Sequence, residues 1–457
     1  MNTVEQVQRV RDFWGAFTSA STNRKIFGAA AIVALLTGLV KLAAVVKELV
    51  VAWRFGTADT LDAFFIALLI PSFIVTVVAR SFNPVFIPAY ILAREQEGAE
   101  RAERLLAGAS LCMGGLLVAM TLVIVFGAPA YLPYLASGFG AEKLKLTEQL
   151  LVITSPVILL KGVVSLWSAV LNAGERFALA ALSPVVTPVV TILFLVLSRE
   201  KGVFALADGL VWGALLEMLL VGAALRRKGV HLLPRWHGLD ASLRGVISQY
   251  AMILVGVLLL NSADLVDQSM AAVLEPGSVS ALNYGKRING FLVDLTAVAL
   301  STAAIPYFSK LIADRDWEDL RQTLKRSLLM IFVLTVPPSL MFFVLSEFIT
   351  RALFQRGSFT AEDTALVARV QALYVLQIPF HVAGILMVRL ISTMQKNHVL
   401  MWAFGVNLVV NIILNYLFMK WLGVAGIALA TSCEYFLLFL FASFFLYRQL
   451  NGRVDES

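Results

Sequence analysis

The chain contains 457 residues, of which 59% are hydrophobic and only 15% are charged, and its mean hydropathy is +0.82. Soluble domains contain about 45–50% apolar and about 25% charged residues, so this composition excludes an ordinary soluble fold and indicates a polytopic membrane protein. The formal net charge of +7 does not call for a nucleic-acid partner, because the loops predicted to face the cytoplasm account for it.

Apolar runs of about 20 residues, each long enough to cross about 30 Å of hydrocarbon as a helix, recur along the whole chain. Residues 1–25, which precede them, have scattered charges and no compact apolar core with a cleavage site, which predicts a short cytoplasmic amphipathic segment. The sequence therefore predicts an all-α membrane protein with about twelve transmembrane helices. We place these spans at 26–52, 62–91, 104–127, 148–171, 178–198, 203–225, 246–274, 278–308, 324–346, 364–391, 399–419 and 424–447.

A polar interval at 226–245 separates six predicted spans from six. The two halves also echo each other, because "RFGTADTLDAFF" enters the second span and "EPGSVSALNYGK" enters the eighth. Transporters are commonly built from such repeats, with the substrate site between the halves near mid-membrane. We therefore predict two six-helix lobes around a central cavity: an N-lobe at 26–225, a cytoplasmic linker at 226–245, a C-lobe at 246–447 and a cytoplasmic tail at 448–457.

The basic residues predict the orientation. Of the 37 Lys and Arg residues, twenty-one fall in the termini and even-numbered loops and eight in the odd-numbered loops. The positive-inside rule then places both termini in the cytoplasm. Cys112 and Cys433 both fall within predicted spans, where we interpret them as packing residues and not as a disulfide.

Three charges lie inside the first predicted span, at Lys41, Lys47 and Glu48. A charge at membrane depth costs a few kcal/mol even on the lenient insertion scale, so a compensating role is expected. Lys41 lies roughly 23 Å along the helix and is too deep to reach water, whereas Lys47 can extend to the interface. Glu48 follows Lys41 by two turns and shares its face. We predict a Lys–Glu pair facing a wet central cavity; the alternative is an interhelical ion pair that only stabilises the fold.

Further basic residues within spans can line the same cavity. A cluster of cations in a low-dielectric space suits an anionic phosphate or pyrophosphate group. Arg80 and Arg389 lie near span ends and can extend to water, whereas Arg287 lies deeper and is the preferred candidate. The complete set is Arg80, Lys161, Lys286, Arg287, Arg369 and Arg389.

The acidic residues within spans suggest ion pairing or ion coupling. Asp264 and Asp267 are three residues apart on one helix face, where they can pair with Lys286 or Arg287 or bind a coupling cation such as Na⁺ or H⁺. Pairing is the favoured interpretation. Asparagines at 407, 411 and 415 follow an i, i+4 pattern that more often holds helices together than coordinates an ion.

Enzymatic signals are weak. The four histidines have no carboxylate or cysteine arrangement typical of a metal site, and no nucleophile elbow, phosphate loop or dinucleotide fingerprint occurs. The predicted loops are also too short to hold a catalytic domain. We therefore expect a transporter without cofactor or metal, and not a membrane enzyme.

At several segments the sequence resembles a known family. These are "RFGTADTLDAFFIALLIPSF", "FNPVFIPAY", "LVDQSMAAVLEPGSVSALNYGKRINGF", "ALSTAAIPYFSKL", "LFQRGSFTAEDT" and "NLVVNIILNYLFMKWLGVAGIALATS". Together they resemble the MviN/MurJ-type lipid II flippases of the MOP exporter superfamily, in order and over nearly the whole chain.

The resemblance implies a cationic cavity between two lobes and transfer of a polyprenyl-diphosphate-linked peptidoglycan precursor to the periplasmic leaflet of the bacterial inner membrane by alternating access. It implies that Lys41, Lys47, Glu48, Asp62 and Arg287 stand at the family's charged positions. It also implies a protein that functions as a monomer, with lipid II and the bilayer as its partners.

The chain departs from the family in two places. Val75 and Thr76 replace a basic pair, although Arg80 one turn later can substitute, and two C-terminal spans common in the family are not seen. These departures leave another polyprenyl-linked oligosaccharide as an alternative cargo. A MATE-type drug or cation antiporter is a further alternative, which would require a cavity of acidic and aromatic residues. The last alternative is a scaffold protein that transports nothing, for which the cavity charges would be dispensable.

Overall fold

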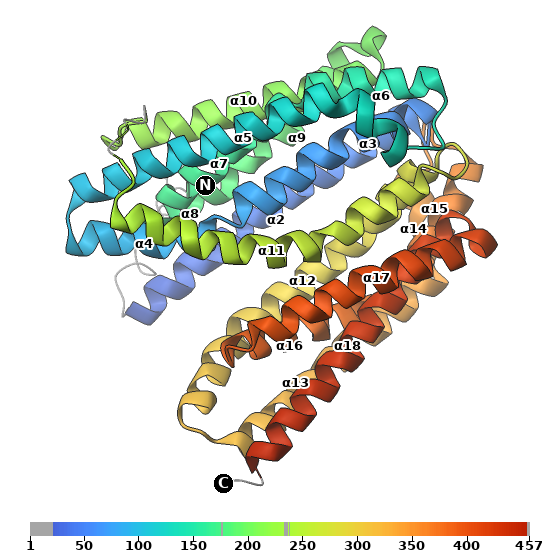
Figure 1. Cartoon of the computed structure of the whole chain (residues 1–457). Helices are drawn as coiled ribbons and strands as arrows, with labels where there is room; N and C mark the ends of the chain where they lie inside the picture. Colours follow the sequence, from blue (N-terminus) through green and yellow to red (C-terminus); the bar gives the residue numbers. More distant parts are fainter. Residues whose placement is uncertain (1–21, 175–176, 233–235, 237, 455–457) are drawn as a thin grey trace, which may run out of the picture. The chain divides into compact units, whose positions relative to one another are not determined.

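The structure, a computed structural model, describes residues 22–174, 177–232, 236 and 238–454, and within these it contains helices and no strand. The N-terminal segment predicted at 1–25 lies largely outside the described residues, as do part of the linker and residues 455–457 of the tail predicted at 448–457. Residues 448–454 of that tail continue helix α18. Figure 1 shows the long helices along the chain. The elements are α2 (Thr22–Phe55), α3 (Asp59–Ile74), η1 (Val75–Arg80), α4 (Asn83–Gln96), α5 (Ala99–Leu135), α6 (Ala141–Thr154), α7 (Pro156–Ala173), α8 (Phe177–Leu182), η2 (Ser183–Val185), α9 (Val186–Leu197), η3 (Arg199–Lys201), α10 (Val203–Arg226), α11 (Ala241–Ala271), α12 (Ser278–Ala313), α13 (Trp317–Val344), α14 (Ser346–Phe354), α15 (Ala361–Val375), α16 (Ile378–Thr393), α17 (Asn397–Leu422) and α18 (Val424–Val454).

Membrane-spanning helices dominate the part of the chain that the structure describes. Nine helical segments are long and apolar enough to cross a bilayer, or ten when α15 and α16, which are bent by 41° at a short break, count as one span. This confirms the predicted all-α membrane class. The first and eighth predicted spans lie in α2 and α12, which are not among these segments, so the count of twelve stays a prediction.

Packing divides the chain into two compact units. Unit 1 comprises residues 1–50, 74–123 and 153–250, and unit 2 comprises residues 51–73, 124–152 and 251–457. Unit 1 contains parts of the predicted N-lobe together with the predicted linker, and unit 2 contains parts of the predicted N-lobe together with most of the predicted C-lobe. The predicted lobes, which are divisions of the sequence, therefore stay a prediction.

In unit 1, close packing of α9 and α10 depends on small residues. A side chain at Gly209 or Gly213 would come within 2.8 Å of the backbone of Thr191 or Thr187. This small-xxx-small spacing lets two membrane helices approach closely. A buried ion pair adds to the contact, because Lys161 of α7 pairs with Glu217 of α10 and Thr187 donates to the same carboxylate at 2.7 Å.

A π-helical turn, η1, interrupts the helical segment that runs from residue 59 to residue 96. Wider turns leave carbonyl groups without their usual helical partners, and buried carbonyls need other donors. Side-chain hydroxyls supply them in unit 1: Ser81 donates to the carbonyl of Val77, Tyr250 to that of Val78 at 2.8 Å, and Ser165 to that of Ala79 at 3.3 Å.

In unit 2, a large apolar core joins α12, α13, α16 and α18. Its members are mostly Leu, Ile, Val and Phe, including the fully buried Leu320, Ile331 and Leu390. A second contact surface in this unit gathers helix ends: the last turn of α2, the first turns of α3, α12 and α15, and part of α6. The candidate site described next lies there.

Candidate functional site

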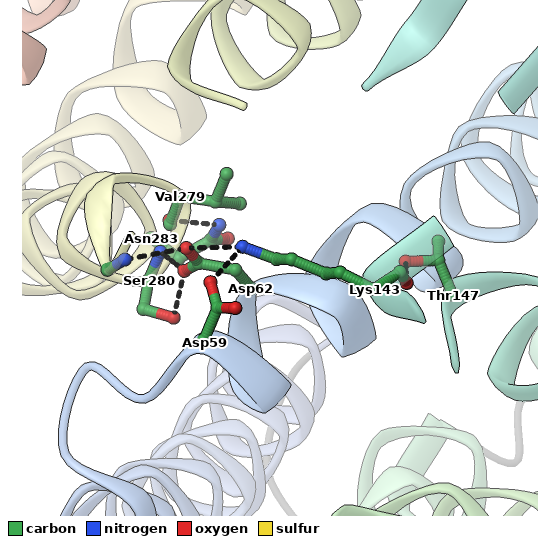
Figure 2. Close-up of polar contacts among 8 residues, drawn as sticks. Asp59, Asp62, Lys143, Thr147, Val279, Ser280 and Asn283 are labelled. Atoms are coloured by element: carbon green, nitrogen blue, oxygen red, sulfur yellow. Dashed lines mark hydrogen bonds and ion pairs between the residues drawn. The ribbon is translucent and has the colours of Figure 1, made fainter. Parts of the chain in front are cut away.

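Asp62, in the first turn of α3, is the centre of this site and is only 1% exposed. Its carboxylate accepts a hydrogen bond from the backbone N–H of Gly277 at 2.7 Å. Ser280 donates twice to the same carboxylate, from its backbone N–H at 2.7 Å and from its hydroxyl at 2.6 Å. Figure 2 shows these contacts converging on the two carboxylate oxygens.

The start of α12 explains why a carboxylate binds there. The first N–H groups of a helix have no partner within it, and they form the positive end of the helix dipole. Gly277 is the N-cap residue of α12, but it has no side chain that can accept a hydrogen bond. Asp62 supplies the missing acceptor from another helix, so α3 caps α12.

Lys143 on α6 gives the carboxylate a counter-charge. Its ammonium lies 3.4 Å from Asp62 and also pairs with Asp59, one turn earlier on α3 (Figure 2). The same ammonium lies 3.7 Å from the centre of the Phe139 ring. Three helices, α3, α6 and α12, are thus joined at one point.

Adjacent contacts extend this junction to the ends of α2 and α15. Thr57 donates to Asp363, which also closes the capping box of α15 with Thr360. The backbone N–H of Ser358 donates to the carbonyl of Trp53 at 2.8 Å. The hydroxyl of Tyr284 donates to the carbonyl of Gly56 at 3.1 Å. We call the contacts of Asp62 with Gly277, Ser280 and Lys143, together with these three bonds, the helix-end latch.

The latch also depends on close backbone approach. Gly277 has a left-handed φ of 88°, and a side chain at this position would come within 2.9 Å of the Thr57 carbonyl oxygen. Only glycine adopts this conformation readily and also leaves room for the neighbouring chain. The glycine of "EPGSVSALNYGK" therefore permits the contact with α3.

The predicted charges of the first span lie in unit 1. Lys47 and Glu48 form an ion pair at 2.5 Å, and Glu48 is 6% exposed. Lys41 lies on the exposed face of the same helix, and Arg80 is exposed at the end of η1. Glu48 was predicted to share a helix face with Lys41 and to form a Lys–Glu pair there, and the structure shows its ion pair with the adjacent Lys47.

The remaining predicted residues lie in unit 2. Lys286 pairs with Asp264, which matches the interpretation that the span acids partner the span bases. Arg287 is exposed, and its guanidinium lies 5.9 Å from the centre of the Phe65 ring. Because the predicted cavity residues are divided between the two units, their gathering into one cavity stays a prediction.

Asp267 lies in a buried polar network of unit 2. It accepts hydrogen bonds from Asn411 at 3.1 Å, Asn415 at 2.7 Å and Thr431 at 3.1 Å. Glu434 accepts from Asn411 at 2.8 Å. The predicted asparagine ladder thus joins α17 to α11 and α18 through two carboxylates. Thr431 and Glu434 were not predicted as its partners. No cluster of three or more metal-ligating side chains occurs among the described residues.

The fold is that of a polytopic α-helical membrane protein. Its fold is similar to that of a MATE family multidrug transporter of the MOP superfamily in an inward-facing conformation, with a TM-score of 0.73, 12% identity and coverage of 94% of this chain and 99% of the other. It is also similar to a structure of the lipid II flippase MurJ in an inward closed conformation, with a TM-score of 0.78, 23% identity and coverage of 91% and 87%.

Sequence comparison assigns the family. The model of the lipid II flippase MurJ family matches residues 51–456, so the chain belongs to this family. A "Probable lipid II flippase MurJ" of Vibrio cholerae is 29% identical over 91% of this chain and 82% of its own length. The "Lipid II flippase MurJ" of Burkholderia cenocepacia is 27% identical over 89% of this chain and 80% of its own length. The predicted resemblance is confirmed.

Proposed function

We propose that this protein moves lipid II from the cytoplasmic to the periplasmic leaflet of the bacterial inner membrane by alternating access. The observation that carries the proposal is the match of the lipid II flippase family to residues 51–456. The protein then acts as a transporter and changes no covalent bond of its cargo. In this proposal both termini face the cytoplasm and the monomer is the working unit.

The diphosphate of the cargo is bound by cations in the proposed cavity. Lys41 and Arg287 are the principal candidates, with Lys47, Lys286 and Arg80 in support. An exposed guanidinium at Arg287 and an exposed ammonium at Lys41 support this role, because charges in membrane helices are costly unless they serve a polar path. Glu48, paired with Lys47, limits the excess positive charge.

The helix-end latch closes the periplasmic side in this proposal. The predicted orientation places the starts of α3 and α12 on that side. Opening requires the Asp62 carboxylate to exchange its three hydrogen bonds with α12 for bonds to water. A hydrogen bond to a charged group contributes about 1.5–3 kcal/mol, so binding of cargo or ion must favour the open state by a comparable amount.

Net transport in one direction needs a driving force, because binding alone moves no cargo uphill. Asp264 and Asp267 are the proposed coupling residues, for Na⁺ or H⁺. The burial of Asp267 among amide and hydroxyl groups of two other helices, α17 and α18, supports this role. Flipping by proteoliposomes under an imposed Na⁺ or H⁺ gradient tests it: loss of the gradient response in Asp267→Asn is expected, and an unchanged response would remove this assignment.

Complementation of a flippase-depleted bacterium tests the proposed function. The readout is the accessibility of lipid II in the outer leaflet, in cells expressing wild type, Lys41→Ala, Arg287→Ala or the control Lys420→Ala. Lys420, an exposed residue in the last turn of α17, should tolerate the change. Wild type should restore translocation and the two cavity variants should not. Correct insertion of wild type without translocation would remove lipid II as the cargo, and full activity of both cavity variants would remove the binding mechanism.

The alternative cargo is another polyprenyl-linked oligosaccharide. It is favoured by Val75 and Thr76, which stand where the sequence resemblance implies a basic pair. Restoration of O-antigen or capsule export, instead of lipid II translocation, in the corresponding depleted strains would identify it.

A further inference from the structure

A cavity of about 700 Å³ opens in unit 1 where four helix ends meet. These are the last turns of α4, α7 and α10 and the first turn of α5 (Figure 1). A second hollow of about 390 Å³ adjoins it and shares Arg94 and Gly174 with it. The cavity is separate from the helix-end latch, the polar network of Asp267 and every predicted cargo residue.

The lining of this cavity is cationic. Arg94, Arg227 and Lys228 line it together with one carboxylate among the described residues, that of Glu103, and Glu95 lines the adjoining hollow. Glu103 is already engaged by the imidazole Nδ1 of His231 at 3.1 Å. The side chains of the three cations form no ion pair or hydrogen bond with the rest of the described chain. Within the described residues the three cations of the cavity therefore have no ion-pair partner, and their field favours an anionic occupant.

The neutral part of the lining adds hydrogen-bond donors. Tyr90 is 5% exposed and ends a row of packed rings with Phe82 and Phe86, whose neighbouring centroids are 5.4 and 5.6 Å apart. This packing holds its phenol, a donor, against the cavity. Ala99 brings the first turn of the 37-residue helix α5 to the wall, and the N–H groups at the start of a helix, which have no partner within it, also favour an anion.

The position of the cavity selects the kind of anion. All four helices cross the membrane as apolar segments, so their common ends lie at the level of the lipid phosphates. Basic pockets between helices at this level bind phosphorylated lipid head groups. Ligand pockets commonly have volumes of about 300–1,000 Å³, a range that suits a head group.

We propose that this cavity binds the phosphate of an anionic phospholipid head group. Arg94, Arg227 and Lys228 neutralise the phosphate, and Tyr90 donates to it from the wall. A soluble phosphate has the same chemistry, but the bilayer is the source that lies beside the cavity. This binding does not depend on the identity of the transported cargo.

The test is lipid binding by the purified full chain in detergent, measured by native mass spectrometry with phosphatidylglycerol and, separately, phosphatidylcholine. Each basic residue near a charged lipid surface contributes about 1 kcal/mol, so loss of all three should weaken phosphatidylglycerol binding more than about tenfold. The variant is Arg94→Gln with Arg227→Gln and Lys228→Gln, and phosphatidylcholine binding should not change. Arg226→Gln, a neighbouring basic residue outside the lining, is the matched control and should bind as wild type does.

Two further arms make the result decisive. The variant Arg94→Lys with Arg227→Lys keeps the positive charge and should still bind phosphatidylglycerol. It tests the site even when the triple glutamine variant does not fold. Glycerol phosphate and inorganic phosphate are titrated as soluble probes and should bind far more weakly than the lipid. Equal affinity for glycerol phosphate and phosphatidylglycerol would overturn the bilayer as the source. Wild-type affinity in a folded triple variant, or loss of binding in the charge-retaining variant, would overturn the site.

Discussion

Ser280 donates both its backbone N–H and its hydroxyl to the carboxylate of Asp62, a residue 218 positions earlier in the chain. One side chain from α3 thereby serves as the cap of α12. Caps normally come from the residue that precedes the helix, but Gly277 occupies that place and has no acceptor side chain. The stability of the first turn of α12 is therefore linked to the position of α3.

Asp62→Asn should open the helix-end latch. The amide keeps one acceptor oxygen, but it loses the negative charge and places an N–H₂ group opposite the donors of Gly277 and Ser280. The substitution should therefore cost about 1.5–3 kcal/mol, the usual contribution of a hydrogen bond to a charged group. Opening of the latch is measured by the rate of thiol labelling at Val279→Cys, a fully buried position, in a chain in which Cys112 and Cys433 have been replaced. Thiol labelling should become at least about tenfold faster. Asp59→Asn, which loses only the exposed contact with Lys143, should have a smaller effect; equal labelling of all variants would contradict the latch.

Lys143→Met should weaken the same latch by less than Asp62→Asn, because the bonds from α12 remain. In a double-mutant cycle, the added effect of Lys143→Met on labelling should be smaller once Asp62 is already Asn than in wild type, since the ion pair with Asp62 is already gone and only the contacts with Asp59 and Phe139 remain. Lys143→Arg, which keeps the charge, should restore most of the slow labelling. Strict additivity of the two changes would show that Lys143 acts elsewhere.

Gly277→Ala should destabilise the chain more than Gly98→Ala. Both glycines have positive φ angles, 88° and 92°, but an added methyl group meets Thr57 at Gly277 and nothing within 4 Å at Gly98. The backbone strain of about 1 kcal/mol is common to both, so the difference isolates the contact with Thr57, in the loop between α2 and α3. Thermal unfolding in detergent measures it. A Gly98→Ala variant as unstable as Gly277→Ala would assign the effect to backbone conformation alone.

Lys161→Met should be strongly destabilising, because it leaves Glu217, 1% exposed, without its cation. Removing one partner of a buried ion pair costs about 3–5 kcal/mol, whereas replacing both by apolar residues is often neutral. Lys161→Met with Glu217→Met should therefore recover most of the lost thermal stability. A double variant less stable than the single one would show that the pair itself stabilises unit 1.

Much of the fold follows from local properties of the sequence. Each apolar run predicts its own helix, and the predicted spans from 62–91 to 424–447 lie in the helical segments seen. The 41° bend between α15 and α16 lies beside Pro379, and proline is the residue expected to kink a helix. The π-turn was not predicted, because its stability depends on hydroxyl donors from distant helices.

Less of the site could be predicted. Asp62 and Gly277 were noted because the segments that contain them echo each other, but no local signal showed that the echoing segments contact each other. Lys143 lies 81 residues from Asp62, so only the folded chain brings it there. The asparagine ladder was correctly assigned to helix packing from its spacing. Its carboxylate partners required knowledge of which helix faces α17.

The π-turn at η1 has a consequence for reading the amphipathic pattern of its span. A helix at 3.6 residues per turn advances about 100° for each residue, so one extra residue rotates everything beyond it by that angle. The phase of α4 is therefore offset from that of α3, and the boundary between the two packing units, at residues 73 and 74, falls at this change. A single helical wheel drawn for residues 59–96 would therefore give a wrong angle around the helix axis between the face that bears Asp62 and the face that bears Tyr90.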